Sequence, residues 1–299
     1  MNTKKIKHSW DDRIFDWICN IFLFLFIVVV FYPLWFVLMA SFSDPVYVNN
    51  GSILIIPKGF TLEGYQMVFG DSKVWFGYLN TIIYTVCGTI FGTIVTVLGG
   101  YVLSRKDLVG RDIIMKLMVF TMYFSGGTIP LYLVVQKLGL LNTRTVLIVL
   151  GSVSVYNLII VRSFMASTIP DELHDAATID GCGNGNFIVR VVLPLSKAVI
   201  AVMVLYIAVA HWNSYFNALM YVTDSNKMPL QLYLREILVL SSSLANSFDV
   251  DPELQEKMQH MSMIIKYSMI VVSTGPILCV YPFIQKYFVK GVMIGSVKG

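Results

Sequence analysis

A cluster of aromatic and amide side chains interrupts one of the long apolar segments of this 299-residue chain. Aromatic rings can cover the C–H faces of a sugar, and amide groups can donate to and accept from its hydroxyls. The cluster runs from His211 to Asn217 and includes Trp212, Asn213, Tyr215 and Asn217. Polar groups within a membrane span usually face a wet cavity or the interior of a helix bundle. The cluster therefore fits a sugar pathway, and it equally fits an aromatic belt with hydrogen bonds between helices.

Helical geometry is expected to divide this cluster between two faces. On a continuous helix Trp212 and Tyr215 share one face, with Phe216 close to it, while Asn213 and Asn217 share another. All seven side chains then cannot line one path. We expect His211 to be a hydrogen-bonded structural histidine and not a proton relay.

Other polar side chains in apolar segments are candidates for the same pathway, with helix packing as the competing explanation. They are Tyr123, Ser125, Thr128, Tyr132 and Asn157. Two glycine pairs, Gly99-Gly100 and Gly126-Gly127, predict close helix packing or a kink and no ligand chemistry.

Motifs for catalysis, nucleotide binding and metal binding are missing from the sequence. It contains no HExxH, no GxSxG and no GxxxxGK[ST], and its four cysteines form no CxxC. We therefore expect a protein that is not an enzyme and that itself holds no cofactor and no metal.

The composition predicts an integral membrane protein, because 56% of the residues are hydrophobic and only 13% are charged. We expect an all-α polytopic fold with one membrane domain, residues 1–299. Most of the 22 lysines and arginines fall on the side of the N-terminus, which places both termini in the cytoplasm and gives no sign of nucleic-acid binding. Six apolar runs are long enough to be spans: 17–41, 76–103, 114–135, 146–161, 199–222 and 267–288.

The two longest connections, 42–75 and 224–266, are expected to face outside. They fit solvated loops and equally a docking surface for an external partner. Within the second, the segment Leu230–Leu244 is too short and too charged for a straight span, which favours an interfacial or re-entrant helix.

A polar, glycine-rich stretch, residues 163–196, separates two of these runs. Pro170 and the acids after it predict a helix start, and Gly181 suits the left-handed conformation that follows a helix end. Leu173, Ala176 and Ala177 would form one apolar stripe whose alanines allow a partner to approach. Asn184 or Asn186 would cap a second helix, 187–193, limited by Pro194. We expect a helical knob on which another protein can push.

Several motifs in this stretch and around it resemble those of a known family. Asp175-Ala176-Ala177, Asp180-Gly181 and Leu193-Pro194 resemble the EAA loop in permease subunits of binding-protein-dependent ABC importers. Asp175 stands where that family usually has Glu, and Cys182 where Ala is usual. The resemblance covers nearly the whole chain. Segments similar to the carbohydrate branch, related to maltose-type inner permeases, are 126–130, 138–143, 156–160, 211–217 and 290–299.

The resemblance implies a type I ABC importer permease core with cytoplasmic coupling helices. The chain would form half of the pathway for an oligosaccharide or a polysaccharide fragment in a bacterial plasma membrane. Its partners would be a second permease, two ATPases that hold ATP and Mg²⁺, and an external solute-binding protein. The residues expected to couple to the ATPase are Asp175, Ala176, Ala177, Asp180, Gly181, Leu193 and Pro194.

Two other functions compete with this interpretation. An ion-coupled secondary transporter normally needs charged residues inside the membrane, and the central parts of the six expected spans lack them. A membrane enzyme needs a nucleophile and a base at a recognisable spacing, and none is found.

Overall fold

A computed structural model describes residues 10–245 and 252–296, which form helices joined by turns and loops and contain no strand. The chain forms two compact units, 1–70 with 237–272 and 71–236 with 273–299. Two helices have residues in both units, α14 (Leu230–Ala245) and α15 (Pro252–Ser296). Organisation of the whole chain as one membrane domain stays a prediction.

The first unit contains α1 (Trp10–Ser41), α2 (Pro45–Asn49) and α3 (Glu63–Gly70) besides parts of α14 and α15. In the most apolar stretch of α1 no residue is buried, as suits a helix whose solvent is lipid. Helix α3 lies close to α15, because a Cβ on Gly64 would meet the Ser268 hydroxyl at 2.3 Å. Phe36 of α1 contacts the edge of the Tyr267 ring.

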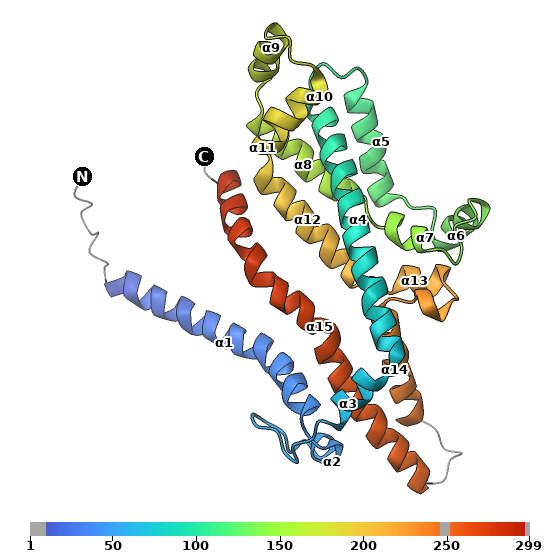
Figure 1. Ribbon diagram of the computed structural model, residues 1–299. Coiled ribbons are helices and arrows are strands. Elements are labelled where there is room, and N and C mark those ends of the chain that lie inside the picture. Colours follow the sequence, from blue (N-terminus) through green and yellow to red (C-terminus); the bar gives the residue numbers. More distant parts are fainter. Residues whose placement is uncertain (1–9, 246–251, 297–299) are drawn as a thin grey trace. The chain divides into compact units, whose positions relative to one another are not determined.

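The second unit is built around one long helix, α4 (Figure 1). Its main partners along the chain are α8 and α12. The helices of this unit are α4 (Ser72–Ser104), α5 (Arg111–Tyr123), α6 (Thr128–Lys137), α7 (Arg144–Val149), α8 (Val155–Thr168), α9 (Asp171–Ile179), α10 (Asn184–Phe187), a π-helical turn (Ile188–Val192), α11 (Leu193–Leu195), α12 (Lys197–Trp212), α13 (Phe216–Tyr221) and a 3₁₀ turn (Ser225–Lys227).

Glycines bring α4 close to its two partners. A Cβ on Gly100 would lie 2.5 Å from Cγ1 of Val161 in α8, and one on Gly88 would lie 2.3 Å from Nε2 of His211 in α12. Helix association in lipid depends on such close approach, because lipid tails are as apolar as the side chains. The close packing predicted for Gly99-Gly100 is confirmed.

Three of the expected spans are broken in the structure. The predicted run 114–135 is interrupted after Tyr123, and α5 and α6 meet at 115° (Figure 1). Gly127 has φ +87° there with no atom near its missing Cβ, so this glycine pair serves a kink and not packing. The run 146–161 is split between α7 and α8, and the run 199–222 between α12 and α13. Apolar residues continue across each break, so hydropathy alone wrongly predicted continuous helices.

Among the described residues, three helices are long and apolar enough to cross a membrane: Trp10–Ser41, Ser72–Ser104 and Lys257–Cys279. Two bent pairs raise the number to five if each pair is one span. The second pair joins the segment Asn184–Leu195, expected at the membrane surface, to α12 at 82°. The count of six stays a prediction. Leu230–Ala245 is a helix, as expected of that segment.

The Gly100 contact gives a test of this packing. Gly100→Ala is expected to lower the stability of the second unit by about 1–3 kcal/mol, because the added methyl overlaps Val161. Gly275→Ala in α15 is the matched control, since nothing lies within 4 Å of that Cβ position. Thermal unfolding of the purified protein in detergent measures both. Equal stability of the two variants would contradict the packing.

Candidate functional site

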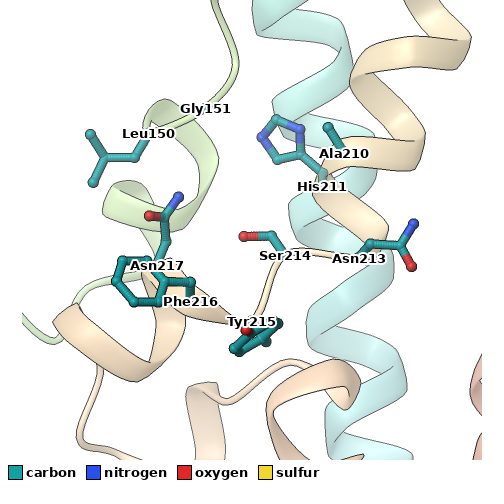
Figure 2. A pocket seen from close by; sticks show the side chains of 9 residues that line it. All are labelled: Leu150, Gly151, Ala210, His211, Asn213, Ser214, Tyr215, Phe216 and Asn217. Atoms are coloured by element: carbon teal, nitrogen blue, oxygen red, sulfur yellow. The ribbon is translucent and has the colours of Figure 1, made fainter. Parts of the chain in front are cut away.

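A cavity of about 220 Å³ opens where α12 ends and α13 begins (Figure 2). Its wall combines amide, hydroxyl and aromatic side chains with apolar ones. The lining residues are Leu150, Gly151, Ala210, His211, Asn213, Ser214, Tyr215, Phe216 and Asn217. These groups can hydrogen-bond hydroxyls and cover C–H surfaces of a neutral polar ligand.

The break between the two helices brings this wall together. Helix α12 stops at Trp212, and the next residue, Asn213, donates from both its backbone N–H and its side chain to the Val209 carbonyl, at 3.1 Å and 2.9 Å. Because α13 starts only at Phe216, Asn213, Tyr215 and Asn217 line one cavity. The expected division of these residues between two faces of a continuous helix is therefore wrong.

His211 is a structural histidine, as expected. Its side chain is buried, and Nδ1 lies 3.0 Å from the Ile207 carbonyl of its own helix. Nε2 lies 3.2 Å from the Ser152 hydroxyl and 3.4 Å from the Ile148 carbonyl. These bonds hold α12 against the α7–α8 connection and fix one end of the cavity.

A second cavity, of about 540 Å³, lies at the kink between α5 and α6. Ser125 and Thr128, both pathway candidates, line it, while Phe216 and Asn217 line both cavities. Asn217 thus occupies a position common to the two. The other lining residues are Gly126, Gly127, Pro130, Leu131, Val134 and Tyr221.

Four of the expected pathway residues line neither cavity. Tyr132 is half-buried and stacks on the Tyr221 ring, with the ring centres 5.9 Å apart. Trp212 donates from its indole N–H to the Ser273 carbonyl at 3.1 Å and meets Tyr78 edge-on, so it packs helices. Tyr123, the last residue of α5, is 78% exposed. Asn157 is half-buried in α8. For Trp212 the helix-packing alternative fits the structure.

Asn142 organises the turn after α13 and was missed from sequence. Within the described ranges it is the one non-glycine residue with positive φ, +55°. Its side-chain oxygen accepts from the backbone N–H groups of Thr223 and Asp224, and its carbonyl accepts from Lys227 Nζ at 2.9 Å. Asparagine tolerates this conformation, so the Leu-Asn-Thr turn was the available signal.

The second candidate region is the segment expected to couple to an ATPase. Helix α9 begins after Pro170 with Asp171 and Glu172 in its first turn, and Gly181 adopts φ +71°, both as predicted. Asp175, Ala176 and Asp180 are exposed, as are Pro194 and Ile179, the latter at 86%. Leu193 is half-buried against the core.

The two alanines of the expected stripe separate. Ala177 packs against the buried cluster around Phe187, whereas Ala176 is exposed. Ala177 is therefore partly covered by its own protein, and the expectation that both alanines face a partner stays a prediction. Ala176 and Gly181 are exposed and small, so a partner surface can approach closely at these two positions.

The second helix of the segment differs from the prediction. It starts at Asn184, so neither asparagine is its N-cap; Gly183 occupies that position. The Asn184 oxygen lies 3.4 Å from Nε2 of His174, which also meets the Phe187 ring edge-on at 5.2 Å. Pro194 does not end the helical run, which continues to Leu195. The π-helical turn before it already departs from the regular bonding that a proline would break.

Charged groups connect this segment to the loop between α4 and α5. Lys106 Nζ lies 2.8 Å from the Asp171 carboxylate, and this contact raises the pKa of the lysine. The Arg105 guanidinium binds the Asp107 carboxylate with two bonds and lowers the pKa of that acid. These pairs are at the surface, so they position the loop more than they stabilise it. In residues 10–245 and 252–296 no cluster of His, Cys, Asp and Glu is suited to a metal ion.

Comparison with known proteins shows the family. The chain is 40% identical over 288 residues to the polygalacturonan/rhamnogalacturonan transport system permease protein YtcP of Bacillus subtilis, covering 96% of this chain and 99% of that one. The chain belongs to the carbohydrate branch of the ABC transporter permeases. The permease is also 42% identical to protein LplC of Bacillus subtilis, over 96% of both chains. No family model matches.

A solved structure agrees with this permease fold. It is a chain from the crystal structure of a bacterial ABC transporter involved in the import of the acidic polysaccharide alginate. The TM-score is 0.82 and the identity 31%, with 95% of this chain and all of that chain covered. The resemblance of the sequence motifs to this branch is therefore confirmed, and the permease is a membrane protein.

The contacts of His174 predict what keeps the coupling segment rigid. His174→Ala is expected to ease opening of α9 and α10 by about 0.5–1.5 kcal/mol, because the ring contact with Phe187 is lost. Lys106→Gln removes only an exposed ion pair and is expected to have a smaller effect. Hydrogen exchange of the amides in 171–195 measures both. A larger effect for Lys106→Gln would contradict this assignment.

Proposed function

We propose that this permease forms half of the pathway through which an ATP-driven importer takes up oligosaccharides or fragments of a polysaccharide. The observation that carries the proposal is the pair of cavities at the helix breaks, lined by amide, hydroxyl and aromatic groups. The names of the similar proteins support a saccharide cargo. Asn217, which lines both cavities, would contact the cargo as it passes.

The remaining parts of the importer are supplied by partners. We propose a second permease, two cytoplasmic ATPases that bind ATP and Mg²⁺, and an external solute-binding protein, in a bacterial plasma membrane. Both termini and the segment 163–196 would then face the cytoplasm, in agreement with the placement of lysine and arginine. The permease itself would not be an enzyme and would hold no cofactor.

The ATPase would contact the exposed side of the coupling segment. Asp175, Ala176, Asp180 and Gly181 are exposed, while Phe187 behind them is buried among α4, α8 and α12 residues. A push on α9 would therefore reach the helices that carry the cavities. Ala177, Leu193 and Pro194 would contribute by holding the segment in shape.

An ion-coupled transporter is the alternative. The residues that line the two cavities include no Asp, Glu, Lys or Arg within the described ranges. Such a transporter usually places ionisable groups at its ion site. Uptake that stops when ATP is depleted and continues when the ion gradient is collapsed supports the importer; the reverse pattern rejects it.

Substitutions in the coupling segment test the ATPase contact. Ala176→Glu and Gly181→Trp are expected to abolish uptake, because a larger side chain prevents close approach of the ATPase. Val109→Glu is the matched control: Val109 is 93% exposed in the loop between α4 and α5, outside the coupling segment. Uptake in a deletion strain complemented with each variant is measured after membrane levels are equalised. Full uptake by Ala176→Glu and Gly181→Trp rejects the contact.

Asn217 tests the pathway. Asn217→Leu is expected to reduce saccharide uptake about 10-fold or more, because the branched shape of the side chain is kept while hydrogen bonds to hydroxyls are lost. Tyr123→Phe, which removes a hydroxyl outside both cavities, is expected to leave uptake unchanged. Uptake by the same complemented strains is the measurement, and a stronger effect of Tyr123→Phe would show that the pathway runs elsewhere.

A further inference from the structure

A positive charge lies next to one of the residues that line the first cavity. Arg235 of α14 places its guanidinium carbon 5.9 Å from the centre of the Tyr215 ring, and Tyr215 lines the cavity. The arginine is half-buried and belongs to the same compact unit as the cavity. A ligand group that reaches the Tyr215 wall therefore comes near this charge.

The donors of this guanidinium are available. Among the side chains that the structure describes, no carboxylate pairs with Arg235 and no hydrogen bond of its guanidinium is found. Glu236 is its neighbour in the chain, but adjacent helical residues do not face each other. A guanidinium that stacks on a ring leaves its N–H groups in the plane free to form two parallel bonds to a carboxylate.

The surroundings increase the effect of this charge. Among the described residues no Asp, Glu, Lys or Arg lines either cavity, and His211 in the first is held by hydrogen bonds to its own protein. A charge next to a wall of low dielectric interacts more strongly than one in water, and an unpaired charge there is costly. An anionic ligand would offset that cost, whereas a neutral one would not.

We propose that Arg235 makes this permease selective for acidic oligosaccharides, by binding the carboxylate of a uronic acid unit at the Tyr215 wall. The proposal rests on the proposed function and names the class of its substrate. It agrees with the chemistry of polygalacturonan and alginate, which the names of two similar proteins mention. Tyr215 would cover the sugar face while Arg235 binds the acid group.

Uptake of two ligands that differ only in charge tests the proposal. The ligands are a short labelled oligogalacturonate and its neutral methyl ester, given to a deletion strain complemented with each variant. Arg235→Gln is expected to lower uptake of the acid about 10- to 100-fold and to leave the ester unchanged. Arg235→Lys keeps the charge without the planar fork and is expected to recover part of the loss.

Lys73→Gln is the matched control. Lys73 also lies over a tyrosine ring, that of Tyr233, at 6.0 Å, but Tyr233 does not line the cavity. This variant is expected to import both ligands normally. Equal losses for acid and ester in Arg235→Gln, or equal losses of the acid in Arg235→Gln and Arg235→Lys, would show a structural role and overturn the proposal.

The two proposals fail in different ways. Wild-type uptake of neutral oligosaccharides without uptake of the acid overturns the role of Arg235 and leaves the proposed function standing. Absence of uptake of acidic and neutral saccharides by the wild type overturns both. Unchanged uptake of the acid by Arg235→Gln overturns the role of Arg235 alone.

Discussion

The approach of α4 to α8 and α12 is the constraint on which the second unit depends. Gly88 admits the His211 ring, and Gly92 lies so close to the Ser152 carbonyl that a Cβ would be 2.3 Å from its oxygen. Side chains in lipid gain little from hydrophobic association, so backbones must come near for dispersion and hydrogen bonds to act. His211 can then bond Ser152, which fixes the cavity end. A larger residue on α4 would displace the wall before it touched any ligand.

Elements dictated by hydropathy or by one local conformation could be predicted from the sequence. The long apolar runs gave α1 and α4, and the acids after Pro170 with Gly181 gave α9 and its end. The helix breaks were missed, because apolar residues continue through them and hydropathy does not report the backbone conformation. At 213–215 no proline or glycine marks the end of α12, and the Asn213 N–H still bonds to the Val209 carbonyl as in a helix.

The residue types of the cavity wall could be predicted from the sequence, but their arrangement in space could not. The residue types at 213, 215 and 217 indicated sugar chemistry, but their grouping depended on the break. Arg235 appeared from sequence only as a charge that shortens an apolar segment. Its contact with Tyr215 is set by how α14 packs, which the nineteen residues between the two do not reveal. Asn184 was also a reasonable N-cap for the second helix of the coupling segment. Its side-chain oxygen lies near the His174 ring and caps no helix.

The coupling segment and the first cavity are connected through helices of one unit. Phe187 is buried with Val97 of α4, Val161 of α8 and Met203 of α12, and α12 continues to the residues that begin the cavity wall. Close-packed side chains transmit displacement because they have little room to yield. The helix breaks are flexible by comparison. The turns at 124–127 and 213–215 can change angle while the helices on either side stay intact. We infer that movement of α9 changes the cavities through rotation at these breaks, with α4 as the fixed support.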